Sequence, residues 1–164
     1  MENIKDCKIE IRKMNLEDLE SISNILYSDF DDFWSYDVFA SELCSENSSY
    51  FVAIRENEII GFAGFKIICD EAEIMNIVVR KSSRGTGIGS LLLEHLLFEA
   101  HNRGVTVVNL EVDIGNFVAI KLYEKFGFGQ VGFRKGYYGD DGAVYVNIAE
   151  ELIWYSRSSH FTLI

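Results

Sequence analysis

The first candidate for chemistry is a glycine-rich turn near the middle of the chain. Residues 84–90 read Arg-Gly-Thr-Gly-Ile-Gly-Ser, between an Ile-Val-Val strand that ends at Val79 and a Leu-rich helix. Glycine adopts backbone angles that other residues avoid, so successive N–H groups of such a turn can converge on one point. The N-terminus of a helix adds unpaired donors and the positive end of its dipole. Together these features predict a seat for phosphate oxygens.

Two familiar phosphate motifs fit this turn poorly. A P-loop would carry Gly-Lys-Ser/Thr after its glycines, and this turn does not. Gly85-x-Gly87-x-x-Ser90 approaches a dinucleotide fingerprint, but that motif follows an early strand of a βαβ unit. Arg84-x-x-Gly87-x-Gly89 instead resembles the acetyl-CoA-binding segment of the GNAT acetyltransferase superfamily. The resemblance implies that the turn holds the pyrophosphate of acetyl-CoA, and a glycine turn without a ligand is the alternative.

The resemblance also implies which residues form the acetyl-CoA site. The end of the preceding strand can donate a backbone N–H to the oxyanion that develops during acetyl transfer. Asn116 resembles the Asn that contacts CoA in the family, and Asn is also a common helix cap. Three cations near the turn, Arg80, Lys81 and Arg84, suit an anionic ligand. The expected cofactor-binding residues are Ile77, Val78, Val79, Arg84, Gly85, Thr86, Gly87, Ile88, Gly89, Ser90 and Asn116.

A second candidate for chemistry is the strand predicted at 107–113. Its alternation places Val108, Leu110 and Val112 on one face and leaves Asn109, Glu111 and Asp113 on the other. In a sheet covered by helices both faces should be apolar, so a polar face needs water or a site. An amine that attacks a thioester must first lose a proton, and Glu111 is the candidate base, directly or through a water. A surface carboxylate is the alternative for Glu111.

The segment after this strand points to one branch of the superfamily. Leu110-Glu111-Val112, Asn116 and the block from Ala119 to Phe128 resemble the bacterial ribosomal-protein alanine N-acetyltransferases, and the likeness extends to the Tyr-Tyr pair at 137–138. That branch acetylates a protein N-terminal amine. This resemblance implies that Tyr123 is the general acid that protonates the leaving thiolate. The alternative is that Tyr123 is an aromatic residue that only packs at the edge of the core.

The acceptor is the least explicit part of the prediction. The resemblance to this branch implies that the acceptor is a basic ribosomal-protein N-terminus. The two loops that flank the acceptor side in this family carry four acids that could bind its Arg or Lys side chains: Asp31, Asp32, Asp140 and Asp141. The alternative is that these four acids are solvated loop residues. The chain departs from the family pattern at Asp113-Ile114-Gly115, ahead of Asn116, and at Asp140-Asp141-Gly142-Ala143, both near the acceptor side. Two other functions stay open: a GNAT enzyme that acetylates a Lys side chain or a small amine, and a non-catalytic acyl-CoA-binding domain.

These residues require a mixed α/β fold to position them. Hydrophobic periodicity and turn signals predict strands at 8–12, 50–54, 59–68, 71–79, 107–113, 128–135 and 143–148, with helices from Asn15 to Leu26, Tyr36 to Leu43, 88 to 103 and from Asn116 to Gly127. This order matches the GNAT fold, a mixed central sheet of about seven strands with helices on both faces. We expect one domain over 1–164, with its core at about 8–148 and a C-terminal tail at 149–164.

Composition narrows the classes of function. The chain of 164 residues carries a net charge of −11, which disfavours nucleic-acid binding, because phosphate backbones need clustered Lys and Arg. No apolar run approaches the roughly 20 residues of a membrane span, and the first residues lack the apolar core of a secretory signal. Three widely spaced Cys and three scattered His predict no metal site. We therefore expect a cytoplasmic protein without a membrane or nucleic-acid partner.

Overall fold

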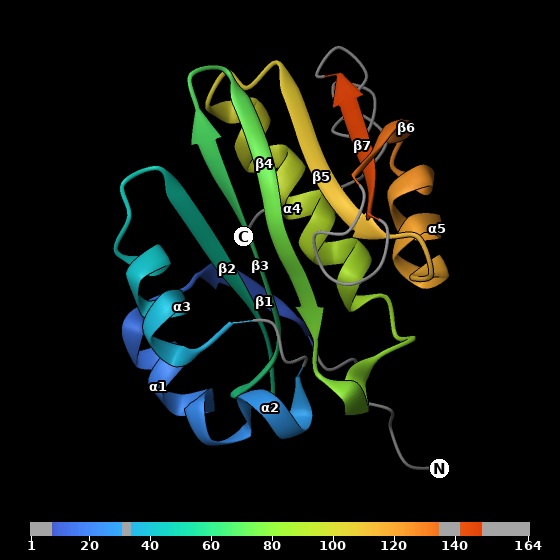
Figure 1. The fold of residues 1–164 in the computed structure, drawn as a ribbon. Helices are drawn as coiled ribbons and strands as arrows, with labels where there is room; N and C mark the ends of the chain where they lie inside the picture. Colours follow the sequence, from blue (N-terminus) through green and yellow to red (C-terminus); the bar gives the residue numbers. More distant parts are fainter. Residues whose placement is uncertain (1–7, 31–33, 135–141, 149–164) are drawn as a thin grey trace. The chain divides into compact units, whose positions relative to one another are not determined.

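The computed structural model describes residues 8–30, 34–134 and 142–148, and Figure 1 shows the helices and strands within them. The elements are β1 (Glu10–Lys13), α1 (Leu16–Ile22), the 3₁₀ turn η1 (Ser23–Ile25), α2 (Leu26–Asp29), α3 (Tyr36–Leu43), β2 (Ser48–Arg55), β3 (Glu58–Ile68), β4 (Glu71–Val79), the 3₁₀ turn η2 (Lys81–Ser83), α4 (Ile88–Asn102), β5 (Val107–Asp113), α5 (Phe117–Lys125), β6 (Gly129–Arg134) and β7 (Gly142–Ile148).

The described strands form a seven-stranded mixed sheet in the order β1-β2-β3-β4-β5-β7-β6. β4 and β5 are parallel, with Glu71 opposite Val107, and the pairs β1–β2, β5–β7 and β6–β7 are antiparallel. This confirms the predicted fold class. The chain divides into two compact units, 1–64 with 76–93 and 65–75 with 94–164, so β3, β4 and α4 each contribute to both.

In the first unit, three short helices accompany β1 and β2, and they are the blue to cyan segments of Figure 1. The sequence predicted one helix from Asn15 to Leu26, which is wrong: α1 ends at Ile22 and a 3₁₀ turn separates it from α2. The Oγ atoms of Ser21 and Ser23 donate to carbonyl groups three residues back, at 2.7 and 2.8 Å. Such back-bonding by serine competes with the helix and bends it.

The N-terminus of α1 is fixed by a capping box and an ion pair. The Asn15 side chain accepts from the Asp18 N–H, and the Asp18 carboxylate accepts from the Asn15 N–H, both at 2.9 Å. Arg12 on β1 donates two hydrogen bonds to the same carboxylate, at 2.7 and 2.8 Å. These bonds to Arg12 hold the pKa of Asp18 below its usual range. They tie α1 to the edge of the sheet.

The core of the first unit is aromatic. Phe39 of α3 packs on Phe62 and Tyr50, with ring centroids 5.1 Å apart in both pairs. A side chain at Gly64 would meet the Tyr50 ring at 2.3 Å, so this glycine makes room for the ring. The tight turn between β2 and β3 has positive φ at Glu56 (52°) and Asn57 (66°), as a primed hairpin turn requires.

In the second unit, β5 lies between β4 and β7, and α5 precedes the edge strand β6 (yellow to red in Figure 1). The inward residues of β5, Val108, Leu110 and Val112, are buried as predicted. α5 begins after Asn116, which caps it, and the chain leaves it through Gly127 at φ +84°. The predicted tail at 149–164 lies outside the described residues.

Among the described residues, no helix is long and apolar enough to cross a membrane. His101 is exposed, whereas His95 is half-buried, and burial lowers the pKa of His95.

Candidate active site

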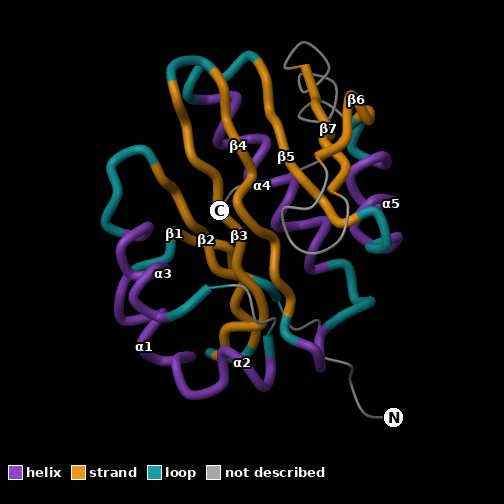
Figure 2. Tube along the Cα trace, viewed as in Figure 1, coloured by secondary structure: helices purple, strands orange, loops and turns teal. Residues whose placement is uncertain are grey.

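The glycine turn joins β4 to α4 through η2 and a short loop, shown in Figure 2 as a purple turn and a teal segment. Gly85 (φ +74°) and Gly87 (φ +87°) both adopt backbone angles that favour glycine. A Cβ at either position would meet no atom of the described residues within 4 Å. The requirement for glycine in the protein alone is therefore conformational and not steric.

The start of α4 leaves backbone donors for a ligand. Its first intrahelical hydrogen bond runs from the Leu91 N–H to the Gly87 carbonyl, at 3.1 Å. The N–H groups of Ile88, Gly89 and Ser90 come before that bond, so they need partners from outside the helix. Ile88 is fully buried and anchors this end of the helix, while 84–87 are exposed. Backbone donors that a helix N-terminus leaves unused fit the phosphates of acetyl-CoA.

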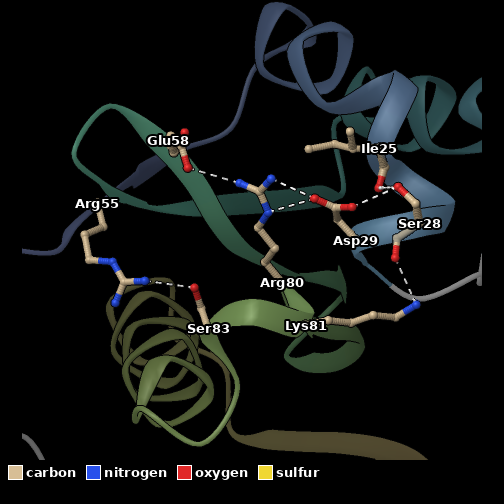
Figure 3. Close-up of polar contacts among 8 residues, drawn as sticks. All are labelled: Ile25, Ser28, Asp29, Arg55, Glu58, Arg80, Lys81 and Ser83. Atoms are coloured by element: carbon tan, nitrogen blue, oxygen red, sulfur yellow. Dashed lines mark hydrogen bonds and ion pairs between the residues drawn. The ribbon is translucent and has the colours of Figure 1, made fainter.

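The cations near the turn are engaged by the protein itself. Arg80 pairs with Asp29 and Glu58, and the Lys81 ammonium donates to the Ser28 carbonyl at 3.0 Å (Figure 3). The Nε of Arg84 donates to the Val79 carbonyl, also at 3.0 Å. The sequence suggested that these three side chains bind an anionic ligand. Their hydrogen bonds within the protein could not be predicted, because no local sequence pattern indicates them.

On β5, Glu111 lines a pocket. The pocket has a volume of about 480 Å³ and is formed by Lys66, Ile68, Cys69, Asp70, Glu71, Ala72, Glu73, Asn109, Leu110 and Glu111. Glu111 is half-buried, with one carboxylate oxygen fully buried. The Asn109 amide donates to the Glu71 carboxylate at 3.3 Å. The polar face of β5 that the sequence singled out therefore borders a recess large enough for part of a small acceptor.

Asn116 and Tyr123 are both positioned by α5. The Asn116 side chain accepts from the Ala119 N–H at 3.2 Å, and its own N–H donates to the Asp113 carbonyl at 2.9 Å. Tyr123 is 8% exposed and packs beside Phe128, with ring centroids 5.9 Å apart. Burial raises the pKa of Tyr123 to about 12, so its phenol keeps its proton at neutral pH. A protonated hydroxyl is what a general acid needs before the reaction.

The predicted residues thus fall into two groups by unit. The strand end 77–79 and the turn 84–90 belong to the first unit; Glu111, Asn116 and Tyr123 belong to the second. The acidic loop residues Asp31, Asp32, Asp140 and Asp141 lie outside the described residues. The acids that line the pocket with Glu111, namely Asp70, Glu71 and Glu73, were not singled out from the sequence. The spacing of Glu71 and Glu73, two residues apart on β4, could have indicated that both lie on one face of the sheet.

Comparison with known proteins gives a consistent result. The model of the acetyltransferase (GNAT) family matches residues 16–128. A Bacillus subtilis protein provisionally named a ribosomal protein bS18-alanine N-acetyltransferase is 32% identical over 136 residues, which cover 82% of this chain and 90% of that protein. The Escherichia coli ribosomal protein bS18-alanine N-acetyltransferase is 38% identical over 105 residues, covering 64% and 70%. The crystal structure of the Escherichia coli enzyme superposes with a TM-score of 0.80 at 31% identity, over 87% of this chain and 94% of that one.

Proposed function

Because this chain belongs to the acetyltransferase (GNAT) family, whose members use acetyl-CoA, we propose that it acetylates the N-terminal α-amine of a protein. The proposed acceptor is the N-terminal alanine of ribosomal protein bS18, and the proposed place of action is the cytoplasm, where ribosomal proteins are made. The observation that carries this proposal is the Bacillus subtilis relative, which is named for this acceptor and matches 82% of the chain.

The proposed proton acceptor is Glu111. An N-terminal ammonium has a pKa of about 7.7–8.0, against roughly 10.4 for Lys, so a modest base is sufficient for an α-amine. A half-buried carboxylate on the wall of a pocket can take that proton directly or through a water. The amine nitrogen then forms a bond to the acetyl carbon, which acetyl-CoA supplies as a thioester.

Two other groups serve the rest of the reaction. A backbone N–H at the end of β4, within Ile77–Val79, donates to the carbonyl oxygen as its negative charge develops. The C–S bond breaks, and Tyr123 gives its proton to the leaving thiolate. The attacking nitrogen loses its second proton as the amide forms, and that proton restores the Tyr123 phenol through solvent. With a pKa raised to about 12 by burial, Tyr123 enters the reaction protonated. The N–H groups of 85–90 hold the pyrophosphate, and Asn116 contacts CoA.

The charge of the chain supports a basic acceptor. The net charge is −11, and three acids, Asp70, Glu71 and Glu73, line the pocket beside Glu111, against one base, Lys66. A ribosomal-protein N-terminus with Arg or Lys after its first residue complements such a surface. Exposed charge pairs are screened beyond about 8–10 Å at physiological ionic strength, so added salt should raise the KM of such a peptide.

The test is a comparison of three acceptors with acetyl-CoA. One is a peptide that begins with Ala followed by basic residues, the second is the same peptide with a blocked N-terminus and an internal Lys, and the third is a polyamine. We expect the free peptide to react fastest and its KM to rise with salt. Faster transfer to the blocked peptide or the polyamine would assign the chain to Lys or small-amine acetylation. No transfer to any acceptor with retained acetyl-CoA binding would favour a non-catalytic acyl-CoA-binding domain.

A further inference from the structure

The entry to the glycine turn is anchored to the end of α2. The Nε and Nη2 atoms of Arg80 donate to one carboxylate oxygen of Asp29, at 3.0 and 2.7 Å, and Nη1 donates to Glu58 at 3.2 Å (Figure 3). Asp29 is the last residue of α2, and Arg80 directly follows β4. The ion pair therefore joins two segments that are 51 residues apart in the chain.

The neighbouring residues repeat the same connection. The Lys81 ammonium donates to the Ser28 carbonyl at 3.0 Å, and the Ser28 hydroxyl donates to the second Asp29 oxygen at 2.9 Å. Two consecutive residues at the start of the turn thus hold two consecutive residues of α2. Hydrogen bonds from Arg80 and Ser28, in that order, hold the pKa of Asp29 below its usual range. The carboxylate is therefore charged near neutral pH.

The backbone of Arg80 belongs to the frame of the turn. Its N–H donates to the Ile60 carbonyl of β3 at 2.8 Å, and its carbonyl accepts from the Ser83 N–H, also at 2.8 Å. The side chain and the backbone of one residue thus fix where the chain leaves the sheet. The N–H donors of Gly85 to Ser90 follow within ten residues.

The two carboxylates that pair with Arg80, those of Asp29 and Glu58, differ in burial. The side chain of Asp29 is 32% exposed and that of Arg80 is 22% exposed, whereas Glu58 is 71% exposed. Solvent screens the Glu58 pair more strongly, and exposed ion pairs contribute little. Asp29 is accordingly the partner that determines the position of the guanidinium, and Glu58 provides a matched control.

We propose that Arg80 is a positioning residue for acetyl-CoA: its ion pair with Asp29 holds the entry of the glycine turn so that the donors of 85–90 meet the pyrophosphate. The proposal rests on the use of acetyl-CoA by this family and not on the identity of the acceptor. Arg80 acts through the turn and makes no direct contact with a phosphate. Asp29, although an acid, thereby favours the binding of an anion.

A double-mutant cycle separates positioning from direct phosphate contact. The variants are Asp29→Asn, Arg80→Gln, the double variant and Glu58→Gln, and the measurement is the calorimetric Kd of CoA without an acceptor. Loss of a partly exposed pair should weaken binding about two- to fivefold in each single variant. The double variant should be no weaker than either single variant, because both remove the same interaction. Glu58→Gln should change the Kd by less than about twofold.

Three outcomes would overturn the proposal. A direct phosphate contact predicts unchanged or tighter binding in Asp29→Asn, which releases Arg80, and weaker binding in Arg80→Gln. A purely structural role predicts a lower Tm with an unchanged Kd. Restored binding in Arg80→Lys would also contradict it, because an ammonium keeps the charge but cannot reproduce the two-donor pairing with Asp29. Each outcome is read without acetyl transfer, so a failure here is distinct from a failure of the proposed acceptor.

Discussion

The glycine turn and the β5–α5 segment show two different ways to build a site. At 84–90 the groups proposed to hold the ligand are backbone N–H donors, while the Arg84 side chain bonds back to the protein. In β5 and α5 the candidate groups are the side chains of Glu111, Asn116 and Tyr123, and the backbone around them is ordinary strand and helix. A backbone site should therefore be sensitive to a change of conformation, and a side-chain site to a change of functional group.

The largest effect should come from Gly87→Val. A branched residue at φ +87° costs about 1–2 kcal/mol in backbone strain and would also occupy the space where phosphates approach. We expect CoA binding to be abolished in a folded variant, as measured by calorimetry. Gly104→Val is the control, because Gly104 has φ +76° and open space but lies after α4. That variant should lose stability and keep its CoA affinity, whereas unchanged affinity in Gly87→Val would remove the turn from the site.

Tyr123→Phe should have the next largest effect. The change keeps the buried ring and removes only the proton donor, so kcat should fall by about 10²–10⁴-fold while the CoA affinity stays near wild type. In the unchanged protein, kcat should show no decline from Tyr123 ionisation up to about pH 10, because a phenol with a pKa of about 12 stays protonated there. Full activity of the Phe variant would assign Tyr123 to packing with Phe128.

Glu111→Gln should have a smaller effect that depends on pH. Near pH 7 most of an α-amine is protonated, so loss of the base should lower kcat/KM by about 10²-fold. As the pH rises through about 7.7–8.0 the free amine no longer needs that base, and the difference from wild type should shrink. The control is Glu73→Gln, which changes an exposed acid of the same pocket. It should leave kcat and the pH dependence unchanged, even if the KM of a basic acceptor rises. A loss that stays constant from pH 6.5 to 9.5 would contradict proton transfer to Glu111.

Patterns that are local in the sequence were predicted well. The helix Tyr36–Leu43 and the strands 71–79 and 107–113 have the predicted bounds, because hydrophobic spacing and flanking turn residues determine them. The burial of Val108, Leu110 and Val112 follows from the same alternation. The family resemblance added the α5 block, whose helix and cap the structure contains.

Features that depend on side-chain geometry or distant partners were not predicted. The break between α1 and α2 accompanies hydroxyl back-bonding by Ser21 and Ser23, which hydrophobic spacing does not show. The pairing of Arg80 with Asp29 joins residues 51 positions apart, so the basic residues near the turn were assigned to the ligand instead. The pocket beside Glu111 arises from neighbouring strands that only the folded sheet brings together.

The most direct test of the proposed activity is to locate the acetyl group in the product. An Ala-initiated peptide that also contains an internal Lys is incubated with acetyl-CoA and the protein, and the product is fragmented by tandem mass spectrometry. We predict that the added mass lies on the N-terminal Ala fragment alone. Acetyl on the Lys side chain, with the N-terminal Ala unmodified, would contradict N-terminal acetylation.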